Sequence, residues 1–191
     1  MDHIQQAQSL ADGFRLYRTQ KPDVIIVDLS MRSRALGGLS FIRRLRIHDA
    51  RTPILVLSMH DDPVIVSRVL SAGASGYILK DTSSEEFTKA LRKVHAGLPY
   101  LSHELASQIA FMEAQGNRSP LKAMTLRELQ TLLLIAEGKP YIAIAEELHV
   151  SYKTVVNTCA QLKSKLGVRT LHELMHIAIQ HLPSAVGKCP T

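Results

Sequence analysis

The chain has 191 residues, of which 46% are hydrophobic, and its formal net charge is +6. This content suffices for one large or two small packed domains, and two separate cysteines exclude a disulfide framework. The charge alone does not establish nucleic-acid binding; with no apolar run long enough for a membrane span and no signal-peptide pattern, we expect a cytoplasmic protein.

The first half of the chain alternates between segments with helical periodicity and short apolar runs. The runs are continuous, which is typical of strands buried on both faces of a parallel sheet. They lie at 24–27, 54–57 and 76–79. The segments with helical periodicity lie at 5–19, 39–47, 61–73 and 83–97. This alternation predicts an α/β fold with a parallel sheet.

From residue 125 onward every segment has helical periodicity. Thr125 and Glu128 form a capping box at the start of the first of these helices, and Ser151 is suited to cap the third. The four helices are expected to run from 125 to before Gly138, from Pro140 to Leu148, from Ser151 to before Gly167, and over 171–182. We therefore predict an α/β domain over 1–112, a linker over 113–122, an all-α four-helix domain over 123–182 and a disordered tail over 183–191.

A polar residue follows each apolar run of the first half: Asp28, Ser58 and Lys80. Because the carboxyl ends of parallel strands meet at one edge of a sheet, these side chains are expected to converge. An acid, a hydroxyl and an amine together can receive a phosphoryl group, with the carboxylate as nucleophile and the other two binding the phosphoryl oxygens. The alternative, that three polar residues merely end three strands, leaves their type, order and spacing unexplained.

The segments D-L-S-M at 28–31, L-S-M at 57–59 and G-Y-I-L-K-D at 76–81 resemble the receiver domains of two-component response regulators. The resemblance implies a flavodoxin-like fold with Asp28 as the phosphoacceptor. It also implies that Ser58 and Lys80 contact the phosphoryl group and that Tyr77 stands at the aromatic switch position. A sensor histidine kinase is then a possible partner.

The chain departs from the receiver pattern before Asp28. Receiver domains begin with a strand that ends in an acidic pair, and this pair holds Mg²⁺. No such strand precedes Asp28, and neither Asp2 nor Asp12 follows an apolar run. We therefore expect an incomplete, N-terminally truncated receiver without a bound cofactor, in which phosphorylation of Asp28 is slow or absent. Arg32 or Arg34 is the weaker alternative for neutralising the phosphoryl charge.

The helical segment carries a second set of motifs. They are T-x-R-E at 125–128, Gly138, I-A-x-x-L at 144–148, S-x-x-T-V at 151–155 and K-L-G-V at 165–168. Together they resemble the helix-turn-helix domain of LuxR/FixJ (NarL)-type regulators. The resemblance implies that the third helix enters the major groove of double-stranded DNA.

The third helix separates an apolar stripe from a polar face. The stripe recurs at intervals of three and four residues: Val155, Cys159, Leu162 and Leu166. The residues expected to contact DNA are Lys153, Thr154, Val156, Asn157, Ala160, Gln161, Lys163, Lys165 and Arg169. Amides can pair with adenine, and the basic side chains can pair with phosphates. Because the family often has Lys and His where this chain has Val156 and Thr158, its affinity or sequence preference is expected to be unusual.

The last helix also carries an apolar stripe, which a small domain is not expected to bury completely. It consists of Leu171, Leu174, Met175 and Ala178. We therefore expect dimerisation through this helix and paired half-sites on DNA.

These patterns predict a DNA-binding transcriptional regulator of a two-component system with impaired phosphorylation. The alternative is a phosphorylation-blind protein that heterodimerises with a full-length response regulator, since the run 24–27 is expected to form a bare apolar edge. An enzyme that uses Asp28 is not expected, because no metal ligands or substrate-pocket motif accompany it. The nine histidines are expected at the surface or in the core rather than as metal ligands.

Overall fold

The structure is a computed structural model that describes residues 3–30, 35–114 and 119–182. The chain forms two compact units, one built mainly from residues before 108 and the other mainly from residues after it. None of the helices in the described ranges is long and apolar enough to cross a membrane. The tail predicted over 183–191 lies outside the described residues.

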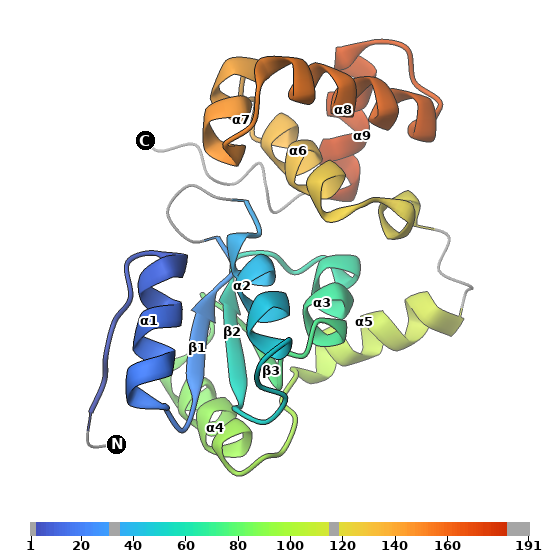
Figure 1. Cartoon of the computed structure of the whole chain (residues 1–191). Helices are drawn as coiled ribbons and strands as arrows, with labels where there is room; N and C mark the ends of the chain where they lie inside the picture. Colours follow the sequence, from blue (N-terminus) through green and yellow to red (C-terminus); the bar gives the residue numbers. More distant parts are fainter. Residues whose placement is uncertain (1–2, 31–34, 115–118, 183–191) are drawn as a thin grey trace. The chain divides into compact units, whose positions relative to one another are not determined.

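The first unit is built on a parallel sheet of three strands, as the alternation of apolar runs and helices predicts. The strands are β1 (Ile25–Asp28), β2 (Ile54–Ser58) and β3 (Gly76–Leu79). Figure 1 shows β2 lying between β1 and β3, which is their hydrogen-bonded order. Because the strands run in one direction, their carboxyl ends lie at one edge of the sheet.

Helices connect and flank these strands. They are α1 (Leu10–Gln20), α2 (Gly37–Arg46), α3 (Pro63–Ser71) and α4 (Ser84–His95), and α5 (His103–Ala114) follows them across the boundary between the two units. Leu55 and Ile78 of the sheet pack against Leu91 and Val94 of α4, so one sheet face is closed by this helix. Tyr100 lies in the same cluster, and its backbone forms an isolated β-bridge with Gly76, the first residue of β3.

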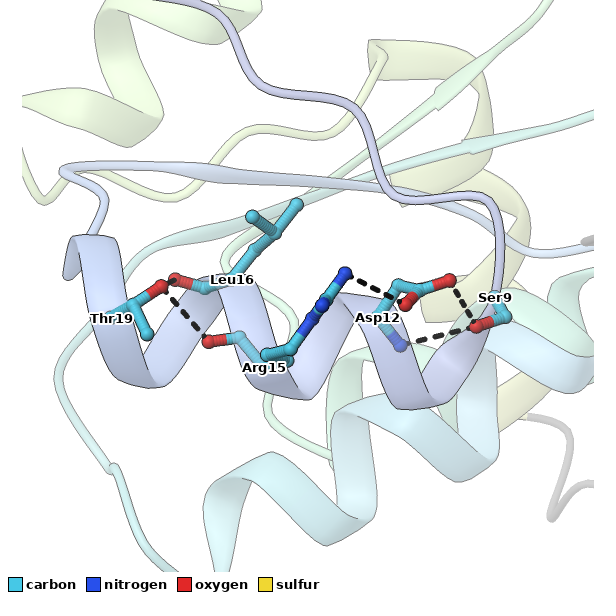
Figure 2. Close-up of polar contacts among 5 residues, drawn as sticks. All are labelled: Ser9, Asp12, Arg15, Leu16 and Thr19. Carbon is cyan, nitrogen blue, oxygen red and sulfur yellow. Dashed lines mark hydrogen bonds and ion pairs between the residues drawn. The ribbon is translucent and has the colours of Figure 1, made fainter.

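Helix α1 begins later than the predicted 5–19 segment, and a local cap explains the difference. Ser9 Oγ accepts a hydrogen bond from the backbone N–H of Asp12 and donates one to Asp12 Oδ2, at 3.1 and 2.7 Å (Figure 2). Arg15 in turn pairs with Asp12 at 3.2 Å. A serine cap of this kind satisfies the first helical N–H groups and fixes the start at Leu10.

Strand β1 lies at the edge of the sheet, as expected for the apolar run 24–27. Within the described residues, no strand pairs with its outer side. Val27 is buried, whereas the side chain of Ile26 is 43% exposed. The first unit therefore has an apolar edge strand, and such strands can pair with a strand of another chain.

The second unit consists of the four helices that the sequence predicts, preceded by the short 3-10 helix η2. Their bounds are η2 (Pro120–Ala123), α6 (Leu126–Ala136), α7 (Tyr141–Leu148), α8 (Tyr152–Leu166) and α9 (Leu171–His181). The predicted capping box is confirmed, because Thr125 Oγ1 accepts from Glu128 N and Glu128 Oε2 accepts from Thr125 N. Helix α6 packs against α7, α8 and α9 and forms the centre of this unit.

The close approach of α2 to β1 requires a glycine at position 38, which gives a first prediction. A Cβ atom at Gly38 would lie 2.6 Å from the backbone oxygen of Asp28 and 2.8 Å from a methyl carbon of Val27. Gly38→Ala is therefore expected to destabilise the first unit by about 1–3 kcal/mol, because backbone has to shift. Urea unfolding checks this, with the exposed Ser40→Ala in the same helix as control. Equal unfolding midpoints for the two variants would contradict the prediction.

Candidate functional site

The carboxyl edge of the sheet brings Asp28 and Lys80 together across 52 residues of sequence. Lys80 Nζ donates to Asp28 Oδ2 at 2.6 Å, and the backbone N–H of Ser30 donates to Asp28 Oδ1 at 3.0 Å. Both carboxylate oxygens thus have a donor. The Asp28 side chain is 38% exposed, so a small molecule in solution can approach it.

Ser58 and Tyr77 lie at the same edge but beneath the surface. Both are completely buried. Ser58 Oγ accepts from the backbone N–H of His60 at 3.0 Å, and the Tyr77 hydroxyl donates to the backbone oxygen of His60 at 2.6 Å. The structure therefore brings all four predicted residues to one edge, but only Asp28 and Lys80 are partly exposed there.

His60 connects these two layers, and the sequence patterns did not identify it. Its side chain is almost fully buried, and its Nε2 lies 3.4 Å from the hydroxyl of Ser30, whose own N–H is bonded to Asp28. No sequence signal identifies it, because a histidine two residues after Ser58 belongs to no distinctive pattern. His60 thus links the backbone that holds Ser58 and Tyr77 to the loop that holds Asp28.

Both oxygens of Asp28 are hydrogen-bonded within the protein, which bears on the expected absence of magnesium. Mg²⁺ binds through oxygen ligands, usually one or two carboxylates with waters or phosphate oxygens. Across residues 3–30, 35–114 and 119–182, no three carboxylate, imidazole or thiol groups lie together in a way that could hold a metal ion. The two oxygens of Asp28 are instead bonded to an ammonium group and a backbone N–H.

Helix α8 is amphipathic in the way the sequence predicts. Val155, Cys159 and Leu162 are buried, and Leu166 is partly buried. Burial raises the pKa of the Cys159 thiol, so this side chain stays neutral inside the domain. The residues expected to contact DNA are exposed, apart from the half-buried Lys163: Lys153, Thr154, Val156, Asn157, Ala160, Gln161, Lys165 and Arg169.

One predicted phosphate contact, Lys165, has a structural role. Its Nζ donates to Glu128 Oε2 at 2.8 Å, and the Glu128 side chain is only 5% exposed. Burial alone would raise the pKa of the Glu128 carboxyl, but hydrogen bonds from Lys165 and Thr125 hold this pKa below its ordinary value. Lys165 therefore neutralises a buried carboxylate that also caps α6.

The expected dimerisation stripe on α9 is corrected by the burial of two of its members. Leu174 and Ala178 are completely buried within the domain, where α9 packs on α6. They contact their own core, so the prediction that they contact a partner is wrong. Leu171 is 45% exposed and Met175 is partly exposed, which leaves these two available. Ile179, which the sequence analysis did not select, is exposed beside them.

His172 and His176 lie four residues apart on α9, a spacing that helical metal sites use. The acidic residue between them is not directed to a metal. Glu173 accepts hydrogen bonds from Thr170 and from the backbone N–H of Arg169, which caps the helix. Among the described residues, no third carboxylate, imidazole or thiol group lies close enough to bind a metal ion together with these two histidines.

Two protein-family models match the chain, one for each unit. The model of the response regulator receiver domain matches residues 1–92. The model described as bacterial regulatory proteins, luxR family, matches residues 122–178.

Similar proteins carry both parts. The methanol utilization control regulatory protein MoxX of Paracoccus denitrificans is 38% identical over 178 residues, which are 93% of this chain and 80% of that protein. The response regulator UvrY of Escherichia coli strain K12 is 33% identical over 180 residues, covering 93% of this chain and 82% of its own length. The solved structure of RcsB from Salmonella enterica serovar Typhimurium bound to promoter rprA, with the phosphomimetic BeF3-, aligns with a TM-score of 0.59 at 26% identity. That alignment covers 87% of this chain and 79% of RcsB.

The ion pair between Lys165 and Glu128 predicts a stability effect. Lys165→Met leaves the Glu128 carboxylate without its cation, and we expect the domain to lose about 1–2 kcal/mol of unfolding free energy at neutral pH. Because the pKa of Glu128 is lowered in the folded state, this contribution is present above the carboxyl's ordinary pKa. It is lost as the pH falls through the folded-state value.

Urea unfolding at neutral and acidic pH measures this effect. Lys163→Met, which removes a cation two residues earlier in α8, is the matched control and should change stability less at neutral pH. The gap between the two variants should close in acid. A gap that is absent at neutral pH, or unchanged in acid, would contradict a structural role for Lys165.

Proposed function

The chain belongs to the response regulators that combine a receiver domain with a LuxR-type DNA-binding domain, and we propose that it binds DNA through α8 while Asp28 is phosphorylated poorly. It is therefore a two-component response regulator and a transcription regulator, not an enzyme. A regulator that binds bacterial DNA acts in the cytoplasm, where this DNA lies, so we propose a cytoplasmic location.

The exposed face of α8 is the single observation that best supports the proposed DNA interface. A helix that enters the major groove needs one face packed in the domain and another free to contact bases. Val155, Cys159 and Leu162 provide the packed face, and Asn157 and Gln161 lie on the exposed one. RcsB, which aligns with this chain, was solved bound to a promoter.

Basic side chains near α8 are proposed to neutralise DNA phosphates. Lys153 lies in the first turn of α8 and is exposed, and Arg169 follows the helix and is also exposed. Lys163 is half-buried near the end of the helix. Together with the absence of acidic residues from 151 to 169, these cations favour a polyanion along this face.

Poor phosphorylation of Asp28 is proposed from the charges around it. An incoming phosphoryl donor is anionic, so its approach to a carboxylate requires neutralising charge. Lys80 provides one positive charge, but it is already bonded to Asp28. Among the described residues, no three carboxylate, imidazole or thiol groups lie together to bind a metal ion.

Dimerisation is proposed through the exposed part of α9. Leu171, Met175 and Ile179 recur at four-residue intervals, with Leu171 and Ile179 exposed and Met175 partly exposed. Such a stripe buried between two copies would give a two-fold symmetric dimer with paired DNA half-sites.

A second candidate function is favoured by the open edge of β1. A phosphorylation-blind protein that heterodimerises with another response regulator could pair its exposed edge with a strand of that partner. The half-exposed Ile26 and the unpaired outer side of β1, noted above for the described residues, support this alternative. It differs from the first candidate in needing a partner before it affects DNA binding.

Electrophoretic mobility shifts of duplex DNA by the full chain at low salt test the proposed function. The chain alone should shift duplex DNA, and binding should weaken steeply as salt increases because counterions are released. Lys153→Ala should weaken binding to all sequences alike and reduce the salt slope by about one. Lys89→Ala, which removes an exposed lysine from α4, is the matched control and should bind normally. No shift by the chain alone, with a shift when a related regulator is added, would favour the second candidate.

Incubation with acetyl phosphate and Mg²⁺ tests the proposed state of Asp28. We expect intact mass to show little or no phosphoryl adduct on the full chain, because the charge of the incoming group is not compensated. Arg32 and Arg34, the possible substitutes, lie outside the described residues. Asp28→Asn provides the control for any adduct elsewhere. A stoichiometric adduct that disappears in Asp28→Asn would contradict the proposal.

A further inference from the structure

We infer that the centre of α8 selects A·T base pairs, with its amide groups bonding adenine and its aliphatic groups contacting thymine methyl groups. This inference rests on the proposed DNA-binding role of α8 and specifies the DNA sequence that this helix prefers. It follows from the chemistry of four exposed side chains in the middle of the helix.

These four residues form two pairs, one helical turn apart. Val156 precedes Asn157, and Ala160 precedes Gln161, so each pair has an aliphatic residue followed by an amide. All four side chains are exposed. The complete burial of Leu162 and the near-complete burial of Val155 and Cys159 fix the opposite side of the helix in the core.

An A·T pair offers the major-groove groups that this set can recognise. Adenine presents an acceptor at N7 and a donor at N6, which a side-chain amide can bond with two hydrogen bonds. Thymine presents a C5 methyl group, which an aliphatic side chain can contact. Asn157 and Gln161 supply the amides, and Val156 and Ala160 supply the aliphatic contacts.

The groups that recognise G·C pairs are missing from the middle of the helix. Guanine is recognised mainly by arginine or lysine, and cytosine by a carboxylate. The segment 151–168 contains no arginine and no acidic residue. Its lysines lie elsewhere: Lys153 is in the first turn, Lys163 is half-buried, and Lys165 is paired with Glu128.

The exposure of Val156 supports a contact rather than a purely structural role. A valine has lower helix propensity than an alanine or a glutamine, because its branched side chain is restricted against the preceding turn. Here 38% of Val156 is exposed, so part of its branched side chain is free to contact a ligand. Burying its methyl groups against a thymine methyl would remove apolar surface from water on both sides of the contact.

Selection of duplexes from a random DNA pool by the full chain, followed by sequencing, tests this inference. The positions that α8 contacts are identified as those whose base preference changes in Val156→Ala, Asn157→Ala or Gln161→Ala. We expect A·T pairs at these positions. Ile47→Ala, which shortens an exposed aliphatic side chain in the first unit, is the matched control and should leave every preference unchanged.

Replacing single thymines by deoxyuridine in the selected duplex then isolates the methyl contact. At one position the wild-type chain should lose about fourfold in affinity, the effect of one methyl group. Val156→Ala should bind the two duplexes equally at that position, whereas Ile47→Ala should still distinguish them.

The outcomes separate this inference from the function on which it rests. Failure to bind or enrich any duplex would overturn the proposed DNA-binding function itself. Enrichment of G·C pairs at the positions that α8 contacts would overturn the base preference while DNA binding stands. A·T enrichment without any effect of deoxyuridine on the wild-type chain would overturn the methyl contact of Val156.

Discussion

The buried carboxylate of Glu128 stabilises the contact between α6 and α8 in the helical domain. It accepts a hydrogen bond from the backbone N–H of Thr125, which fixes the start of α6, and another from Lys165 near the end of α8. Helix α6 is buried from Glu128 to Ala136 and packs against the other three helices. The orientation of α8 relative to this central helix therefore depends on a charge pair as well as on apolar packing.

The carboxylate of Asp28 provides an instructive contrast with that of Glu128. Both are bonded to a lysine and to a backbone N–H. Glu128 is almost fully buried, so loss of its cation would leave a poorly solvated charge inside the domain. Asp28 and Lys80 are each more than one-third exposed, so their pair contributes little to stability and can be exchanged for another partner. The same chemistry thus serves structure in one unit and remains available for ligands in the other.

Local patterns made most of the fold predictable, whereas side-chain contacts between different helices of the helical domain were not predicted. The capping box at Thr125, the three apolar strands and the exposed face of α8 all depend on residues close in sequence. The pairing of Lys165 with Glu128 was not predicted, because the two residues lie 37 positions apart in the sequence. The stripe on α9 could not show whether its apolar residues contact a partner or their own core, since an amphipathic pattern is the same in both cases.

The candidate site at the sheet edge shows the same limit. Parallel strand order predicted that Asp28, Ser58 and Lys80 would converge, and this required no knowledge of side-chain contacts. The depth of each residue was not predictable, because it depends on how the following loop folds over the strand. His60 is buried within that loop and bonds both Ser58 and Tyr77 through its backbone. A histidine two residues after a strand carries no sequence signal for such a role.

Several lysine and arginine side chains of the helical domain pair within the domain, which affects how much they can contribute to DNA binding. Lys165 pairs with Glu128, Lys139 pairs with Glu137 and Glu147, and Arg127 donates to the backbone oxygen of Leu148. These positive charges stabilise the fold and are less available to phosphates, which provide most of the sequence-independent affinity. Fewer phosphate contacts would weaken non-specific DNA binding. Binding to a specific sequence would be weakened less, because base contacts also contribute to its affinity. In the proposed role of α8, a helix whose middle is formed by amides and aliphatic groups would therefore depend on base contacts for a larger share of its affinity.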